Sequence, residues 1–355
     1  MNFKSVEENI ERPETVSMTR LSRLDVCPRS FYFDYYYEGG VQTHAMARGT
    51  LFHDTAEHCT DLLIAAGEGY VPGDVARGVA QENMNESQLV LPHFEQDAVR
   101  LMAWNWGEHH SGSIDLPTLV CNETLLAVEI NGWTLRGRID RAHVNGDHCQ
   151  FYDYKTSLHI PSSEALLQDF QLNFYPLLLA EGKVVNREGS VLDDKPPAAG
   201  ANLFWPTLVY PRFVNEESNE CVVRSPASKG ELVPIKRENL HDLKQAIATS
   251  LKRLEHGLDT GDWPAADGKH CATCASPSRC PIPGELRDFE AVSDHEQAAD
   301  LVSLIERTDA DQTRRKKAVK AFLQENPRVE SAGGHYELKP VKTNPPSTRM
   351  TKVNS

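Results

Sequence analysis

The chain has 355 residues, 40% hydrophobic and 25% charged, which is the composition of a soluble globular protein with one large domain or two ordinary ones. No run of 18 apolar residues predicts a membrane span and the first residues lack a signal-peptide pattern, so we expect a cytoplasmic protein without membrane contact. Its net charge of −14 argues against a general nucleic-acid coat protein but does not exclude a nuclease, because the distribution of charge matters more than the total.

The N-terminal part of the chain begins with a polar stretch, residues 1–17, that we expect to be flexible. Residues 20–37 then form an aromatic-rich segment that predicts a helix, with Cys27 followed by Pro28. The aromatic side chains are expected to pack in the core, and stacking on nucleic-acid bases is the alternative interpretation.

The next predicted helix spans residues 47–66, where apolar side chains recur at helical spacing. His53 lies beside this apolar stripe, near the start of the helix, and by itself such a histidine is typical of a packed or surface residue. Residues 67 to about 115 predict a mostly helical insertion. Within this insertion, His109 and His110 are adjacent in sequence but have no recognisable metal-site partner.

A β-hairpin is predicted from Gly132 to Thr156, because Asn145-Gly146 is a strong signal for a two-residue turn. With this turn, Asp140 on the first strand and Asp153 on the second are diagonal neighbours on one face, roughly 7–8 Å apart at Cα. Lys155 shares the face of Asp153, since side chains alternate along a strand. A three-residue turn would break this arrangement.

Two acids and a lysine on one patch match the chemistry of metal-assisted phosphodiester cleavage. Acid and lysine pairs are also common on solvated hairpin faces, so the pattern alone is weak. The hairpin strands, however, carry many apolar residues and follow another predicted strand, Cys121 to Ile130. Unpaired charges are rarely buried in such a sheet without a function.

The following segment predicts a helix from Glu164 to Gly182, started by Pro161 to Glu164. One polar stripe of this helix carries Gln168, Gln171 and Tyr175, which by themselves fit a solvated face equally well. Further strands are expected at 201–213 and 221–235, followed by an amphipathic helix at 237–256 that Gly257 closes.

The C-terminal residues 285–355 predict a helical, basic extension with helices at 285–306 and 309–324, a short strand at 336–341 and a loose tail. The segment from Asp311 to Ser355 contains ten Lys and Arg residues and four Asp and Glu residues, so its local charge is +6 and the rest of the chain carries −20. The basic helix is either a solvated face or a contact to DNA or a partner.

Cys271, Cys274 and Cys280 lie within ten residues and could direct three thiolates at one metal centre. A fourth ligand is needed, and none follows nearby. The other cysteines include four without any metal-site spacing, which we expect to be ordinary buried residues: Cys59, Cys121, Cys149 and Cys221.

These motifs together resemble the PD-(D/E)XK nucleases of the RecB type, and among them the iron–sulfur branch that includes CRISPR-adaptation and phage-borne exonucleases. The resemblance covers roughly Ser22 to Pro281 and rests on GRIDR at 137–141, YDYKT at 152–156 and the order of the other motifs. Ile139-Asp140 replaces the Pro-Asp of the family's name, a mild departure.

The resemblance implies an α/β fold: a restriction-endonuclease-like mixed β-sheet core flanked by helices, within a nuclease domain at 18–284. It also implies a site. His53 matches the histidine of a Gly-x-x-x-His motif, and Gln171 and Tyr175 match a Gln-x-x-x-Tyr helix that borders the catalytic centre and contacts DNA.

In this interpretation one or two Mg²⁺ or Mn²⁺ ions are held by His53, Asp140, Asp153 and the main-chain carbonyl of Tyr154. Lys155 would position or deprotonate the attacking water or stabilise the phosphate, alternatives that the sequence leaves open. Gln171 would orient Lys155 or the phosphate, and Tyr175 would lie along the DNA path. Two arginines of the GRIDR motif are expected to point away from the Asp140 face and to act only as supporting residues: Arg138 and Arg141.

By the same resemblance, Cys27 is the fourth ligand of a [4Fe–4S] cluster with Cys271, Cys274 and Cys280. Zinc is the alternative for four cysteines. The cluster would act as a staple that joins the two ends of the nuclease domain, without a part in the chemistry.

The expected function is therefore metal-dependent exonuclease activity on DNA with single-stranded or free ends, in recombination, replication, repair or spacer capture. A phosphate-binding loop of the Gly-x-x-x-x-Gly-Lys-Ser/Thr type is absent from the sequence, so the chain would act alone or as the nuclease subunit of a larger complex with a recombination or replication partner. The alternative is a DNA-end-binding scaffold whose partner performs the reaction.

Overall fold

The computed structural model describes residues 12–36, 44–67, 69–89, 91–266, 271, 329–331, 334–341 and 347–353. The chain divides into two compact units. The larger unit contains residues 12–22 and 44–252, and the smaller unit contains residues 23–36 and the described residues from 253 onward.

A mixed β-sheet forms the centre of the larger unit. Three long strands, β2 (Leu119–Ile130), β3 (Trp133–Asn145) and β4 (His148–Tyr154), run antiparallel in succession. The chain then passes through helix α6 (Phe170–Glu181) and returns as β7 (Leu203–Asn215), which pairs parallel with β4. The sheet order is β11-β7-β4-β3-β2-β5-β6. The smaller strands of the larger unit are β1 (Thr15–Ser17), β5 (Lys183–Val185), β6 (Val191–Asp193), β8 (Glu220–Arg224), β9 (Ala227–Ser228), β10 (Glu231–Leu232) and β11 (Ile235–Lys236).

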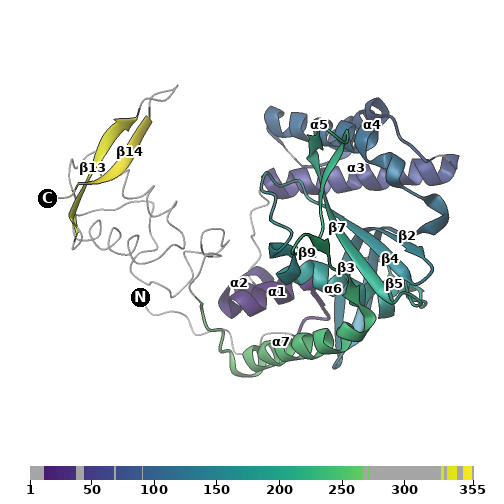
Figure 1. The fold of residues 1–355 in the computed structure, drawn as a ribbon. Coiled ribbons are helices and arrows are strands. Elements are labelled where there is room, and N and C mark those ends of the chain that lie inside the picture. Colours follow the sequence, from purple (N-terminus) through teal and green to yellow (C-terminus); the bar gives the residue numbers. More distant parts are fainter. Residues whose placement is uncertain are drawn as a thin grey trace. The chain divides into compact units, whose positions relative to one another are not determined.

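Three helices pack together over this sheet (Figure 1): α3 (His44–Ala66), α4 (Gly73–Glu86) and α5 (His93–His109). Their apolar faces form one core cluster, and the sheet contributes Tyr152, Tyr154 and Val209 to it. The helical content of residues 67–115 follows the sequence expectation, with two short 3-10 turns after α5 at Ser111–Ser113 and Leu116–Thr118. A mixed central sheet flanked by helices is consistent with the restriction-endonuclease-like fold that the sequence predicted.

Helix α6 is shorter than predicted. A separate 3-10 turn, Ala165–Gln168, precedes it, and the helix itself begins after Asp169, whose carboxylate accepts a hydrogen bond from the Leu172 N–H at 2.9 Å. An aspartate at this position satisfies a free N–H of the first turn, so it starts a new helix where the sequence pattern predicted a continuous one. Because α6 starts later than predicted, Gln168 lies outside it, at the end of the 3-10 turn.

The β3–β4 hairpin turns one residue later than predicted. Asn145 pairs with His148, so the turn residues are Gly146 and Asp147, with Gly146 at φ +60°. The register therefore moves by two residues, which keeps every side chain on its predicted face. Continuing the observed pairing of Arg141 with Tyr152 by one residue puts Asp140 directly opposite Asp153, and not diagonal to it.

Other element boundaries also differ from the prediction. The expected helix at 20–37 is two helices, α1 (Met18–Val26) and α2 (Pro28–Tyr36), because a residue before proline disfavours helical geometry. Strand β1, in the stretch that we expected to be flexible, pairs parallel with β3. The predicted strand at 221–235 is instead the series of short strands from β8 to β11.

In the C-terminal part of the chain, helix α7 (Leu240–Thr260), preceded by a 3-10 turn at Arg237–Asn239, continues through Gly257. That glycine does not close the helix; a Cβ there would lie 2.6 Å from the ring of Trp263, so it gives the tryptophan room. Strands β12 (Val329–Ser331), β13 (Gly334–Val341) and β14 (Ser347–Val353) form a three-stranded sheet. The predicted strand at 336–341 is confirmed, whereas the expectation of a loose tail is wrong at β14.

The predicted helices at 285–306 and 309–324 lie outside the described residues. Within the part of the chain that the structure describes, we find no helix with the length and apolar character needed to cross a membrane.

Gly137 tests the packing of α6 against β3. A Cβ at this position would lie 2.6 Å from Leu178 Cδ1, and Leu178 is fully buried, so a side chain or the backbone must shift within the core. We expect Gly137→Ala to lower the free energy of unfolding by about 1–3 kcal/mol, as overpacking does. Gly200→Ala, where an added Cβ meets nothing within 4 Å, is the control in urea unfolding. Equal midpoints for both variants would contradict this packing.

Candidate active site

Asp140 on β3 and Asp153 on β4 are buried acids on neighbouring strands. Their exposed fractions are only 5% and 2%. The main-chain N–H of Tyr154 donates a hydrogen bond to Asp140 Oδ2 at 2.6 Å, where β4 ends. The structure thus brings together the two acids that the sequence analysis paired, as directly opposed residues rather than the diagonal neighbours that it expected.

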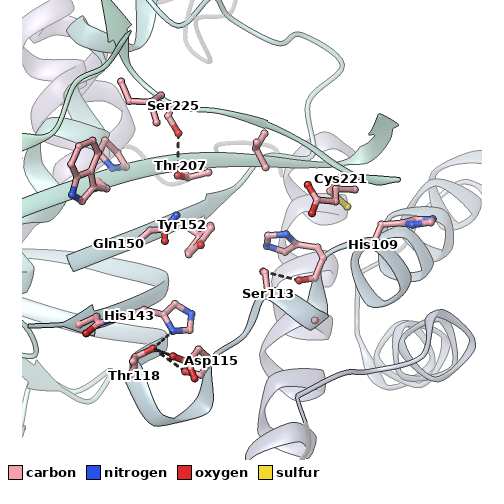
Figure 2. Close-up of a pocket in the computed structure, with 18 of the residues that line it drawn as sticks. His109, Ser113, Asp115, Thr118, His143, Gln150, Tyr152, Thr207, Cys221 and Ser225 are labelled. Atoms are coloured by element: carbon pink, nitrogen blue, oxygen red, sulfur yellow. Dashed lines mark hydrogen bonds between the residues drawn. The ribbon is translucent and has the colours of Figure 1, made fainter. Parts of the chain in front are cut away.

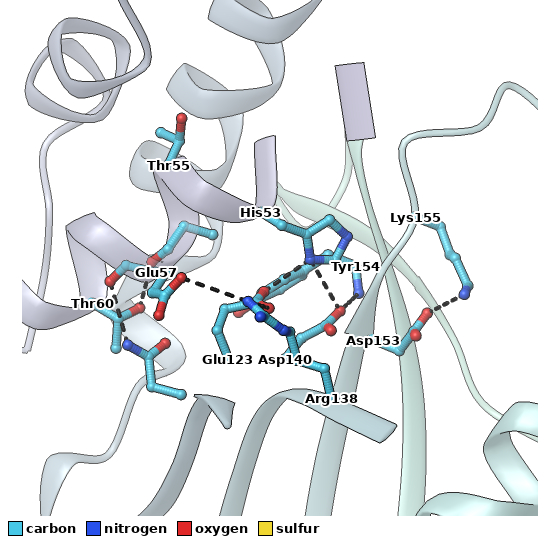
Figure 3. A network of polar contacts seen from close by, with 12 residues as sticks. His53, Thr55, Glu57, Thr60, Glu123, Arg138, Asp140, Asp153, Tyr154 and Lys155 are labelled. Atoms are coloured by element: carbon cyan, nitrogen blue, oxygen red, sulfur yellow. Dashed lines mark hydrogen bonds and ion pairs between the residues drawn. The ribbon is translucent and has the colours of Figure 1, made fainter. Parts of the chain in front are cut away.

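Two more side chains approach Asp140 from other elements (Figure 3). His53, on α3, places Nδ1 2.8 Å from Glu123 Oε1 and 3.6 Å from Asp140 Oδ2. Glu123 comes from β2. One possible ligand atom from each of His53, Glu123 and Asp140 lies within 4.8 Å of the other two. Among the described residues, no other set of three or more His, Cys, Asp or Glu side chains comes this close together. An imidazole and two carboxylates suit Mn²⁺ or Mg²⁺.

Glu123 was not predicted from the sequence. Its neighbours Asn122 and Thr124 pair with Arg141 and Ile139, so Glu123 faces Asp140 across the strands. Its side chain is 1% exposed and its φ is +43°, an unfavourable backbone conformation for a glutamate. The only sequence feature that could have identified Glu123 is an acidic residue within an apolar strand. Glu129 on the same strand has this feature too but is exposed, so the feature does not distinguish a site residue.

The close approach of these groups changes their proton affinities. Burial of the His53 ring opposes protonation, but the Asp140 carboxylate and the hydrogen bond to Glu123 outweigh it and raise the pKa of His53 to about 10. Burial, together with the charges of Glu123 and Asp153, raises the pKa of Asp140 well above its ordinary value, although His53 opposes this rise. The cluster thus concentrates negative charge that a bound cation would offset.

Lys155 links the metal-type cluster to helix α6. Its Nζ lies 2.6 Å from Asp153 Oδ2 and donates to Gln171 Oε1 at 3.2 Å. The Gln171 amide in turn donates to Asp153 Oδ1 at 3.0 Å and contacts the hydroxyl of Tyr175. Burial lowers the pKa of Lys155, but the adjacent Asp153 outweighs this, so the net pKa is raised. The Tyr175 hydroxyl lies 3.5 Å from Asp153 Oδ1, so both residues that the resemblance placed in the site from this helix contact Asp153.

A cleft of about 560 Å³ contains all six predicted catalytic residues together with Tyr154 and Glu123. Arg138 also lines it, with Nη1 3.8 Å from Glu123 Oε2. The expectation that Arg138 points away from Asp140 is wrong, because residues two apart on a strand share a face. Arg141 does face the other side, where its guanidinium lies 4.0 Å from the centre of the Tyr152 ring.

A second cavity, of about 1140 Å³, lies beside Tyr152 and the β3–β4 hairpin (Figure 2). His110 and His143 line it, and both have lowered pKa values, caused first by burial and then by the charge of Arg141. The pKa of His143 falls to about 4. Among the described residues that line this cavity, no three metal-type ligands lie close enough together to hold one ion.

The cysteines predicted to hold an iron–sulfur cluster are only partly described. Cys27 is buried between α1 and α2, and Cys271 is half-buried. Cys274 and Cys280 lie outside the described residues, so the cluster stays a prediction. The four cysteines without metal-site spacing are buried, and burial raises the pKa of each thiol, to about 12 for Cys59, Cys121 and Cys221.

A mixed sheet with buried carboxylates, an imidazole and a lysine around one cleft defines a candidate centre for metal-dependent hydrolysis. A sequence model of the PD-(D/E)XK nuclease superfamily matches residues 15–281, and the chain belongs to this superfamily. No curated protein matches the chain. A solved structure described as the crystal structure of SSO0001 aligns with 77% of this chain and 89% of its own, at 12% identity and a TM-score of 0.32. That likeness carries no argument about function.

Glu123 is expected to hold a cation together with His53 and Asp140. Glu123→Gln keeps the size of the side chain but removes its charge, so we expect Mn²⁺ to bind at least about 10-fold more weakly. Isothermal titration of the protein with Mn²⁺ in the absence of DNA measures this. The matched control is Glu129→Gln, on an exposed position of the same strand. Unchanged Mn²⁺ affinity in Glu123→Gln would leave Glu123 with a structural role only.

Proposed function

We propose that this PD-(D/E)XK nuclease is a metal-dependent exonuclease that cleaves phosphodiester bonds at DNA ends. The observation that supports this best is the juxtaposition of two groups in one cleft. His53, Glu123 and Asp140 form a ligand cluster within 4.8 Å, and the Lys155–Asp153 pair lies next to it. Superfamily membership supports nuclease chemistry, and action on ends in recombination, replication or repair is the finer part of the proposal.

The donor set fits a divalent cation. The carboxylates of Glu123 and Asp140 and the imidazole of His53 converge on one point. The negative charge of Asp153 acts on Asp140 as well. Such oxygen and nitrogen donors suit Mg²⁺ or Mn²⁺, and the main-chain carbonyl of Tyr154 is the further ligand that we propose. When bound, the cation supplies charge that lowers the pKa of a water nucleophile and offsets the charge of the phosphate.

Lys155, Gln171 and Tyr175 act on the phosphate or on the residue that contacts it. We assign Lys155 to donate hydrogen bonds to oxygens of the scissile phosphate, because its Nζ is already held at the edge of the cluster by Asp153 and Gln171. Gln171 fixes the direction of the lysine side chain. Tyr175, in contact with Gln171 and 4% exposed, holds Gln171 rather than offering a broad surface to DNA.

Variants of Asp153 and Lys155 test the proposed reaction. With Mn²⁺, we expect the parent protein to degrade linear DNA and Lys155→Ala and Asp153→Asn to lower the rate by at least about 100-fold. Lys155→Ala removes a positive charge from the phosphate, and Asp153→Asn removes a carboxylate that attracts the cation and holds Lys155 in place. Lys183→Ala, on an exposed position of β5, is the control. Oligonucleotides labelled at the 5′ or 3′ end report the rate and the direction of degradation, and chelation of the metal should stop it.

Three results would contradict this proposal in different ways. Equal activity in all variants would show that the residues are wrongly assigned. Cleavage of circular DNA as fast as linear DNA would reject action at ends. An inactive parent that still binds DNA ends would favour the scaffold alternative.

We further propose that Cys27, Cys271, Cys274 and Cys280 hold a [4Fe–4S] cluster. The support is the spacing of the cysteines, with Cys27 and Cys271 in the same compact unit. A cluster at this place would stabilise the fold rather than take part in the reaction.

The colour of the purified protein tests this cluster. We expect a brown preparation with broad visible absorption and bound iron, both lost in Cys27→Ser and Cys271→Ser. Cys221→Ser, at a buried cysteine without metal-site spacing, should keep them. A colourless protein that contains zinc would replace the iron–sulfur assignment, because Zn²⁺ gives no such absorption.

A further inference from the structure

The catalytic cleft has a second end, lined by arginines. Arg136 and Arg138 precede Asp140 on β3 at intervals of two residues, and all three line the same cleft (Figure 3 shows Arg138 beside Asp140). Residues two apart on a strand share a face and are separated by about 7 Å. Arg136 therefore lies about 14 Å along β3 from the metal-type cluster. Arg187, from the turn between β5 and β6, lines the cleft as well.

Arg136 is held in a fixed position. Its Nη1 donates to the main-chain carbonyl of Arg187 at 3.3 Å. Its guanidinium lies directly against Gly189, where an added Cβ would overlap with it, and the φ of +91° at Gly189 also requires glycine. Arg136 Nε is buried and has no hydrogen-bond acceptor among the described residues. The side chain is thus prepositioned while part of its donor capacity is unused.

The charge at this end of the cleft is not neutralised. Arg138 lies within 4.0 Å of the carboxylates of Glu57 and Glu123. By contrast, neither Arg136 nor Arg187 forms an ion pair with a carboxylate in the described part of the chain. Asp54 lines the same cleft; burial and then the charge of Glu123 raise its pKa, and the charge of Arg187 is the smallest of those that oppose the rise. An anion that reaches the cleft here meets two arginines that have no carboxylate partner among the described residues.

The start of helix α1 adds donors to the same end. Ser17, paired with Arg136 in the β1–β3 register, accepts a hydrogen bond from the Arg20 N–H through its hydroxyl at 3.4 Å and so caps the helix. Met18 and Thr19 follow it, and both line the cleft with Ser17. Their N–H groups have no acceptor within the helix and carry its partial positive charge.

We propose that Arg136, Arg187 and the first turn of α1 bind a second phosphate of the DNA strand whose scissile phosphate lies at the metal-type cluster. The proposal rests on the proposed function. Guanidinium groups and helix N-termini are the preferred partners of phosphate. The same chemistry fits an internal phosphodiester further along the strand or a phosphomonoester at its end. In either case this contact fixes how far the strand enters the cleft and therefore which bond is cut.

Binding of a fluorescent single-stranded oligonucleotide tests this subsite. The titration is done in EDTA at several salt concentrations, so that no cleavage occurs. We expect Arg136→Gln and Arg187→Gln each to weaken binding about tenfold. Each should also lower the slope of log affinity against log salt concentration by about 0.7, the value for one lost phosphate contact on a single strand. Arg77→Gln, at an exposed arginine of α4 paired with Asp74, should match the parent protein.

Two further oligonucleotide sets identify the source of the phosphate. Strands with and without a 5′- or 3′-terminal phosphate are compared first. If the subsite takes a phosphomonoester, the parent prefers one phosphorylated end and Arg136→Gln loses that preference. If it takes a phosphodiester, end phosphorylation has no effect, and one neutral methylphosphonate linkage at a defined distance from the end weakens binding of the parent but not of Arg136→Gln.

Parent affinity and parent salt slope in both arginine variants would overturn the proposal. Arg187 is exposed, so Arg187→Gln decides the matter even if Arg136→Gln does not fold. Failure of the subsite is also distinguishable from failure of the nuclease assignment. Metal-dependent cleavage with unchanged salt slopes rejects only the subsite, whereas reduced slopes without any cleavage reject only the enzyme.

Discussion

The crowding of carboxylates at the end of β3 and β4 is the constraint on which the site depends. Glu123, Asp140 and Asp153 are each under a tenth exposed, and burial of like charges at short range is strongly unfavourable. Two side chains offset part of this: the His53 imidazole contacts two of the acids, and the Lys155 ammonium contacts the third. Such an arrangement is tolerated where a bound cation completes the compensation, which is why the cluster supports a metal-dependent reaction.

The fold supplies this crowding through backbone geometry. The hairpin register puts Asp140 opposite Asp153, and the left-handed backbone at Glu123 brings a carboxylate from β2 to the same point. Gly137 lets α6 pack directly on β3, which places Gln171 within reach of Lys155 and Asp153. These features belong to neighbouring elements, so a change in one of them moves the whole set of ligands.

The cleft therefore has two ends of opposite sign in a protein with a net charge of −14. Acids gather where a cation is expected, and Arg136 of β3 and Arg187 of the turn between β5 and β6 lie at the other end. In the proposed arrangement, a nucleic-acid strand needs no large basic surface, because the bound cation and the arginines at the other end would each meet a phosphate. The overall acidity of the chain is compatible with a nuclease for this reason.

The sequence by itself determined the local motifs: Asp140, Asp153 and Lys155 from strand alternation, and His53, Gln171 and Tyr175 from a family resemblance that the match over 15–281 supports at the level of the superfamily. Strand alternation depends only on spacing along the chain. The tertiary structure decided what depends on neighbouring strands: the exact opposition of the two acids, the place of Glu123, and the inward direction of Arg138. It also brought Arg136, Arg187 and the start of α1 together. Residues so far apart in sequence meet only through sheet order and register, which no local pattern encodes.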